Sequence, residues 1–271
     1  MVQPEGFVDH KHPRKVCKLS RFIYGLKQAS RSWNKRFDEK IKKFGFAQNL
    51  DESCVYQKAS GSNVTFFILY VDDIIIMENH IPSLQGVKDY LRKCFSMKDL
   101  REASFILKIK IYRDKSKRLI RPGQNDFMDK ILKRYQIDNS KRSNIPIQER
   151  LDLNKTQGAS TTEEVKCMQN VPYASAVGSI MYAVRYTRPD VAFAQNITSR
   201  FQQNPSEPQW TAVKNILKYL RNTKDMFLVC GGNPKAELRV DCYCDVGFET
   251  DRDDIKTQTR YAFVLNGGAM D

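Results

Sequence analysis

The segment Tyr70-Val71-Asp72-Asp73 carries the clearest chemical signal in the sequence. Adjacent carboxylates repel each other strongly unless a positive charge lies between them. A divalent metal ion would supply that charge. In nucleotidyl transfer, two Mg²⁺ ions about 3.5 to 4 Å apart, held by carboxylate oxygens, activate the attacking hydroxyl and stabilise the leaving group. A solvated turn is the competing interpretation, since aspartate is common in turns, and the four residues alone leave both open.

Apolar runs on either side predict that the two carboxylates lie on a β-hairpin. Residues 64–70 are rich in β-branched and aromatic side chains, and residues 74–77 resume the apolar run after the polar break. The pattern predicts a strand, a tight turn formed by Asp72 and Asp73, and a second strand.

Further elements follow from the spacing of apolar residues along the chain. Spacings of three and four predict helices at 32–44, 84–94, 127–135, 177–184 and 206–220, with another beginning at Pro189. Ser206 caps the 206–220 helix, and Gln209 reaches back to its start. Alternation predicts single strands at 105–111, 238–245 and 261–265, whereas the polar segment 139–170 indicates a linker.

Composition favours a polyanionic partner. The 271 residues include 45 Lys and Arg against 31 Asp and Glu, which gives a net charge of +14. The seven cysteines form no Cys-x-x-Cys pair, so a zinc site is not indicated and a reduced intracellular compartment is expected. No signal peptide is apparent, and the longest apolar run, 64–77, is shorter than the roughly 20 residues that span a bilayer. We therefore expect a soluble, cytoplasmic protein without a membrane partner.

Further motifs occur in a fixed order around the hairpin. They are Val-Gln-Pro-Glu-Gly-Phe at 2–7, Tyr-Gly-Leu-Lys-Gln-Ala-Ser-Arg-Ser-Trp at 24–33, Met-Lys-Asp-Leu at 97–100, Pro-Tyr-Ala-Ser-Ala-Val-Gly at 172–178 and Thr-Arg-Pro-Asp-Val-Ala at 187–192. Over nearly the whole chain, the series resembles the reverse transcriptase region of copia-type LTR retrotransposon Pol polyproteins. The resemblance implies Mg²⁺-dependent, template-directed addition of deoxynucleotides on an RNA or DNA primer-template, inside a virus-like particle in an intact element.

The resemblance also assigns roles to residues of the catalytic region. Asp72 and Asp73 match the metal-binding pair of the polymerase palm, on the hairpin that Tyr70 opens. Gln28 matches the region that lines the incoming nucleotide and template, and Gly25 allows close approach of the backbone.

Residues near the predicted site also have structural interpretations. Lys27 and Arg31 either contact phosphates or form a solvated helix start. Trp33 and Trp210 lie at helical spacing among apolar residues, which favours core packing over base stacking. By resemblance, the strand at 105–111 leads into the primer grip.

Residues 242–248 resemble the start of the family's ribonuclease H domain, and Asp245 matches its first catalytic carboxylate. Taken by itself, the alternating pattern favours a strand that merely exposes Asp241 and Asp245, and the resemblance reverses this for Asp245 only.

The predicted fold class is α+β. Residues 1–115 are expected to form a partial reverse transcriptase palm-like sheet with helices, and 116–230 a helical thumb and connection with a polar linker at about 139–171. Residues 231–271 are expected to begin a ribonuclease H-like domain as an incomplete strand pair.

The sequence departs from the family pattern at several positions. Arg101 and Lys108 replace glycines, Ser30 replaces a proline, and Gly247 and Phe248 replace aspartate and tryptophan. A side chain where glycine supplied positive φ costs on the order of 1 kcal/mol.

The resemblance implies that the palm also needs a third carboxylate and fingers, both upstream of the 2–7 motif. We therefore expect a truncated copy whose palm sheet leaves one edge unpaired and an apolar face uncovered. Two functions remain open: a fragment of an RNA-directed DNA polymerase that is inactive alone, and a non-catalytic basic remnant that binds nucleic acid. The sequence does not indicate an oligomeric state.

Overall fold

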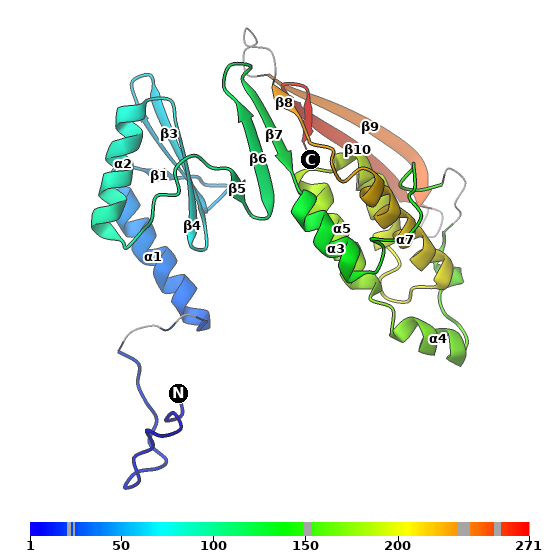
Figure 1. Ribbon diagram of the computed structural model, residues 1–271, viewed down its shortest axis with the longest axis horizontal. Helices are drawn as coiled ribbons and strands as arrows, with labels where there is room; N and C mark the ends of the chain where they lie inside the picture. Colours follow the sequence, from blue (N-terminus) through cyan, green and yellow to red (C-terminus); the bar gives the residue numbers. More distant parts are fainter. Residues whose placement is uncertain (21–22, 24, 149–152, 232–238, 252–255, 271) are drawn as a thin grey trace. The chain divides into compact units, whose positions relative to one another are not determined.

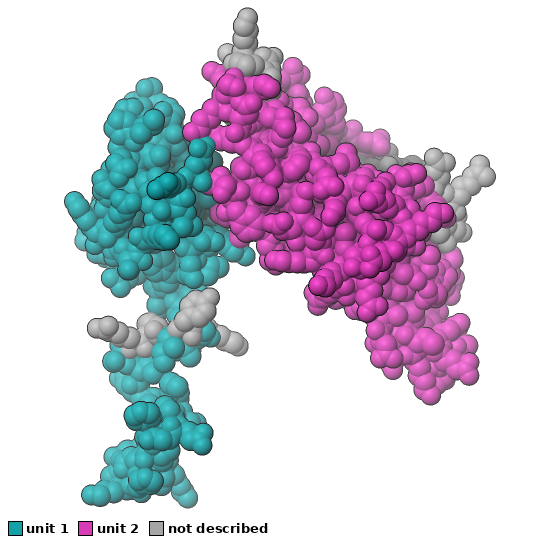
Figure 2. Space-filling view, viewed as in Figure 1, with its two compact units in different colours: residues 1–102 teal, residues 103–271 magenta. Residues whose placement is uncertain are grey.

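The chain forms two compact units, Met1–Glu102 and Ala103–Asp271, which Figure 2 colours separately. The computed structural model describes residues 1–20, 23, 25–148, 153–231, 239–251 and 256–270; the side chains of Lys27, Met270 and residues 246–260 are outside this description. The units divide after Glu102, and the strands that follow pair with residues late in the chain. The domain boundary near residue 115 stays a prediction. The roles assigned to the predicted domains remain predictions.

Unit 1 is a four-stranded antiparallel sheet with two helices (Figure 1). Its elements are α1 (Lys27–Lys43), β1 (Ala47–Gln48), β2 (Val55–Ser60), β3 (Asn63–Tyr70), β4 (Asp73–Glu78) and α2 (Ile81–Cys94). Phe37 and Ile41 of α1 are fully buried and pack with Val87 of α2 against Phe67 of β3. Both helices therefore cover the same face of the sheet, as their predicted apolar stripes require.

The opposite face of this sheet exposes apolar side chains. Phe66 of β3 and Met77 of β4 are cross-strand partners and are 40% and 45% exposed. In the part of the chain that the structure describes, β4 is paired with β3 alone and lies at the sheet edge. The unpaired edge and uncovered apolar face expected from the sequence are thus both present.

Unit 2 combines a helical core with two antiparallel sheets. Its first elements are β5 (Phe105–Ile106), β6 (Ile109–Asp114), β7 (Leu119–Gly123) and α3 (Asn125–Arg134). The helical part follows with η1 (Lys155–Gln157), α4 (Thr162–Gln169), α5 (Tyr173–Tyr186), η2 (Pro189–Val191), α6 (Ala192–Ser199) and α7 (Glu207–Asn222). The last strands are β8 (Cys230–Gly231), β9 (Val240–Asp251), β10 (Lys256–Leu265) and β11 (Gly268–Met270). The core lies between α3, α5, α6 and α7, and its fully buried residues include Ile180, Ile216 and Leu220. The α+β class is confirmed.

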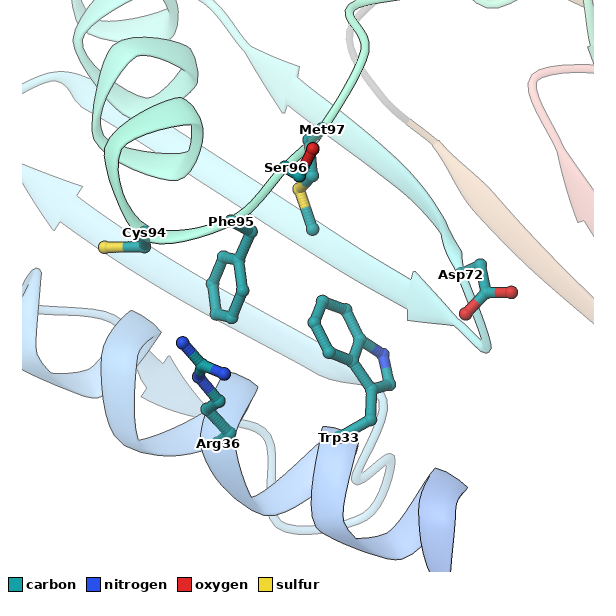
Figure 3. Close-up of a pocket in the computed structure, with 7 residues that line it drawn as sticks. All are labelled: Trp33, Arg36, Asp72, Cys94, Phe95, Ser96 and Met97. Carbon is teal, nitrogen blue, oxygen red and sulfur yellow. The ribbon is translucent and has the colours of Figure 1, made fainter. Parts of the chain in front are cut away.

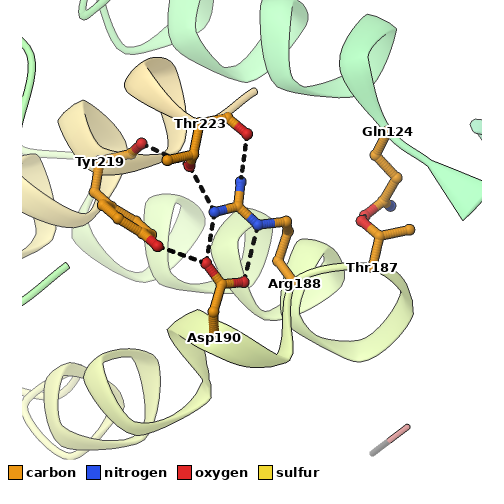
Figure 4. Close-up of polar contacts among 6 residues, drawn as sticks. All are labelled: Gln124, Thr187, Arg188, Asp190, Tyr219 and Thr223. Atoms are coloured by element: carbon orange, nitrogen blue, oxygen red, sulfur yellow. Dashed lines mark hydrogen bonds and ion pairs between the residues drawn. The ribbon is translucent and has the colours of Figure 1, made fainter. Parts of the chain in front are cut away.

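A polar network around the buried guanidinium of Arg188 joins η2 to α7 in unit 2 (Figure 4). Arg188, 4% exposed, donates to both carboxylate oxygens of Asp190 at 2.9 and 2.7 Å and to the Thr223 hydroxyl at 2.6 Å. The Tyr219 hydroxyl donates to Asp190 at 2.8 Å. Both carboxylate oxygens of Asp190 accept hydrogen bonds, and their pairing with Arg188 compensates the burial of its guanidinium charge.

Two local predictions differ from the structure, and a third is confirmed. The predicted linker contains helix α4, which begins with a capping box in which Thr161 and Glu164 satisfy each other's backbone N–H groups. Pro189 begins a single 3-10 turn before α6 rather than α6 itself. The predicted reach of Gln209 to Ser206 is confirmed, because its side-chain oxygen accepts from the Ser206 N–H at 2.9 Å.

Candidate active site

The hairpin of β3 and β4 presents the two predicted metal ligands at its tip. Tyr70 and Asp73 are the last paired residues, so Val71 and Asp72 form the two-residue turn. The prediction that Asp72 and Asp73 form the turn is therefore wrong by one residue. The register is set by buried Phe67, which lies opposite Ile76, and a shift by one residue would turn these side chains to the exposed face.

The turn has an unusual backbone conformation at Val71. Its φ is +52°, in the left-handed region that β-branched residues rarely adopt. Such conformations cost about 1 to 3 kcal/mol and persist only where surrounding contacts hold them. The tip is thus a strained connection between two regular strands.

Asp72 and Asp73 are both exposed. Neither carboxylate has a hydrogen bond or ion pair with another described residue. They therefore offer hard oxygen donors of the kind that Mg²⁺ takes. Among the described residues, however, no group of three or more His, Cys, Asp or Glu side chains gathers that could hold a metal ion. The residues present thus fit part of a Mg²⁺ site.

Trp33 of α1 contacts the hairpin tip directly. Its indole N–H donates to the carbonyl of Val71 at 2.8 Å. The ring packs edge-on against Phe95, with centroids 5.0 Å apart, and lies 5.8 Å from the ring of Phe37. Packing on the core was predicted for Trp33, but its hydrogen bond to the tip was not, because no periodic pattern relates residues 38 positions apart.

A cavity of about 430 Å³ lies beside this contact (Figure 3). Its lining is mixed, with aromatic, sulfur-containing and charged side chains: Trp33, Arg36, Asp72, Cys94, Phe95, Ser96 and Met97. The Arg36 guanidinium lies 5.8 Å from the centre of the Phe95 ring. One cation, Arg36, and one of the two tip carboxylates, Asp72, therefore line the same cavity.

The other predicted site residues lie on α1, before it and on β3. Gln28 and Arg31 are exposed on the first turns of α1, and the side chain of Lys27 is outside the described residues. Gly25 has a φ of +91° with open space where a Cβ would lie, so its backbone conformation, rather than close packing, favours glycine. Tyr70 is 52% exposed.

Asp245 lies on β9, which belongs to unit 2. It pairs in register with Arg260 of β10, and its side chain is exposed. The predicted strand pair is present, while the role of Asp245 stays a prediction.

The segment predicted as one strand at 105–111 is a hairpin of β5 and β6. Leu107 and Lys108 form its two-residue turn, with φ of +49° and +62°. Arg101 also has a positive φ, +68°. Both positions flagged as replaced glycines therefore adopt a backbone conformation that favours glycine.

No described helix is both long and apolar enough to cross a membrane.

Known proteins resemble this chain along its length. Residues 1–149 match the family described as reverse transcriptase (RNA-dependent DNA polymerase). The chain is 40% identical over 271 residues to the Retrovirus-related Pol polyprotein from transposon TNT 1-94 of Nicotiana tabacum, covering 100% of this chain and 20% of that protein. It is 30% identical over 267 residues to the Pol polyprotein from transposon RE1 of Arabidopsis thaliana, covering 98% and 17%.

A putative transposon Ty5-1 protein of Saccharomyces cerevisiae is 28% identical over 99% of this chain and 84% of its own length. The chain thus spans a fifth or less of the two plant polyproteins. No solved structure matches it.

Proposed function

Because the chain belongs to the reverse transcriptase (RNA-dependent DNA polymerase) family, we propose that unit 1 carries the metal-binding hairpin of a copia-type retrotransposon polymerase. The reaction is template-directed addition of a deoxynucleotide to a primer. The primer 3′-hydroxyl attacks the α-phosphorus, the bond to the β-phosphate oxygen breaks, and pyrophosphate leaves.

The observation that supports this proposal is the exposed tip of the β3–β4 hairpin. Asp72 and Asp73 lie side by side there, without a partner among the described residues, on a turn strained at Val71. Adjacent exposed carboxylates add nothing to packing and repel each other, whereas a bound cation reverses the sign of that interaction. Strained backbone is also a feature that clusters at functional sites.

Each residue then has a distinct task. Asp72 and Asp73 hold Mg²⁺, which supplies positive charge to the attacking and leaving oxygens when bound. Gln28 and Gly25 line the nucleotide and template together with Tyr70. Lys27 and Arg31 bind phosphate groups, for which their fixed positive charge is suited.

By resemblance to the family, the proposed site needs one more carboxylate, and no cluster of three metal-binding side chains occurs among the described residues. We expect that ligand on a strand that pairs with the edge of β4, whose unpaired N–H and C=O groups are a template for strand addition. The chain by itself is therefore expected to lack polymerase activity.

A second candidate is a non-catalytic protein that binds nucleic acid through its basic surface, which the net charge of +14 favours. Under that reading, binding would fall steeply with salt and would be indifferent to Asp72 and Asp73. By resemblance, Asp245 would belong to a ribonuclease H site in either case.

Primer extension on an RNA template with Mg²⁺ tests the proposal. The chain is compared with a fusion in which the acidic strand of a retrotransposon polymerase precedes it. We expect extension by the fusion only, abolished by Asp72→Asn plus Asp73→Asn. The matched control is Asp51→Asn plus Glu52→Gln. This double substitution removes the same charge from an exposed acidic pair elsewhere in unit 1.

Extension by the chain alone, lost in the double variant, would support the polymerase but contradict the expected inactivity. A fusion without activity that still binds primer-template in a salt-sensitive way would favour the second candidate.

A further inference from the structure

The Val71 carbonyl connects the strained tip to the core of unit 1. It accepts the indole N–H of Trp33 at 2.8 Å, and it belongs to the peptide plane that continues into Asp72. A hydrogen bond to this carbonyl therefore fixes the orientation of the peptide from which the Asp72 side chain projects.

Trp33 is itself held firmly. Two turns of α1 beyond it, Ile41 is fully buried, as is Phe37 between them. The indole ring contacts the rings of Phe37 and Phe95 and forms one wall of the cavity that Asp72 also lines (Figure 3). The donor thus comes from a helix that packs on the core of unit 1, and the acceptor belongs to a turn in which Val71 has an unfavourable positive φ.

We propose that Trp33 is a positioning residue for the Asp72 and Asp73 carboxylates, acting through its hydrogen bond to Val71. The bond holds the turn in the conformation that presents both carboxylates at the tip of the hairpin. This inference rests on the proposed metal-binding role of the pair, and it adds a residue outside the acidic motif to the site.

A purely structural role for Trp33 would require the shape of the ring and not its N–H. Replacing Trp33 by a benzothienyl analogue of tryptophan, with sulfur in place of the N–H, keeps the shape and removes the donor. Trp33→Phe is the genetic counterpart. The matched control is Trp210→Phe, because Trp210 packs on the separate core of unit 2.

Two measurements on the full chain test the proposal. The first is Mn²⁺ binding followed by water proton relaxation, with Asp72→Asn plus Asp73→Asn to identify the site. The second is hydrogen exchange of the Tyr70 and Asp73 amides in the absence of metal. Loss of one hydrogen bond should weaken Mn²⁺ binding and speed exchange by about 3- to 10-fold in both Trp33 variants, with no change in Trp210→Phe.

Unchanged exchange and Mn²⁺ affinity in the benzothienyl variant would overturn the proposal. Mn²⁺ binding that the aspartate double variant leaves intact would instead refute the proposed metal site. In that case, the exchange measurement alone still decides whether Trp33 holds the tip.

Discussion

The Tyr182 hydroxyl donates a hydrogen bond to the carbonyl of Leu107, which lies 75 residues earlier in the chain. Leu107 and Lys108 form the turn between β5 and β6, both with positive φ. Left-handed backbone costs non-glycine residues about 1 to 2 kcal/mol each. The Lys108 ammonium also lies 5.7 Å from the centre of the Phe127 ring. Contacts from α5 and α3 thus hold a turn that its own residues disfavour.

Arg101 and Lys108 should respond differently to glycine. Arg101→Gly removes a left-handed side chain that makes no hydrogen bond or ion pair with another described residue, and should raise the free energy of unfolding by about 0.5 to 1 kcal/mol. Lys108→Gly also loses the cation–π contacts with Phe127 and Tyr182, worth about 0.5 to 1 kcal/mol, and should be nearly neutral. Urea unfolding measures both. A destabilising Arg101→Gly would contradict the strain argument, and Lys98→Gly, at ordinary φ, is the destabilising control.

Two glycines of unit 2 should respond in opposite directions to alanine. Gly178 lies inside α5 with open space around the position of a Cβ, so Gly178→Ala should stabilise by about 1 kcal/mol. Gly231 has a φ of +93°, and a Cβ there would overlap the carbonyl oxygen of Arg118. Gly231→Ala should therefore destabilise by about 2 kcal/mol or more. Equal melting temperatures for the two variants would contradict this difference.

The Asp190 network should make stability depend on acid pH. Burial raises the pKa of Asp190, but the Arg188 hydrogen bonds and charge, with the Tyr219 hydroxyl, outweigh it and hold the pKa below its usual value. A lowered pKa in the folded state means that the stabilisation is present above about pH 4 and is lost as pH falls through the folded value. In thermal unfolding, the melting temperature of the wild type should fall more steeply with decreasing pH than that of Asp190→Asn.

At neutral pH, Asp190→Ala should cost about 2 to 3 kcal/mol, because it leaves the buried guanidinium of Arg188 without its anion. Asp129→Ala, which removes the partner of Lys224 at the surface, is the control and should change stability by less than about 1 kcal/mol. If the two variants lost comparable free energy of unfolding, burial of Arg188 would not determine the cost of removing its partner.

Val71→Gly should raise the free energy of unfolding by about 1 kcal/mol, because glycine adopts the φ of +52° without a steric penalty. The same substitution at Val55, a paired residue of β2, should destabilise. Chemical denaturation of both variants tests whether strain is stored at the tip. If Val71→Gly lowered the free energy of unfolding as much as Val55→Gly does, no strain would be stored at the tip.

The sequence by itself predicted the main helices and the hairpin that carries Asp72 and Asp73. Apolar spacing placed α1, α2, α3, α5 and α7, because one side of each helix must be buried. The apolar runs on either side of Asp72 and Asp73 predicted the hairpin, and the replaced glycines at Arg101 and Lys108 indicated positive φ, which both residues have.

Only the tertiary structure decided which residues form the hairpin turns and which contacts hold those turns. The register that puts Val71, rather than Asp73, in the turn depends on the burial of Phe67 opposite Ile76 against α1 and α2. The turn at Leu107 is held by a hydrogen bond from Tyr182, and the tip at Val71 by one from Trp33. Both bonds join residues far apart in the chain. Periodicity records which face of an element is buried, but the partner that each residue meets is set by how the elements pack together.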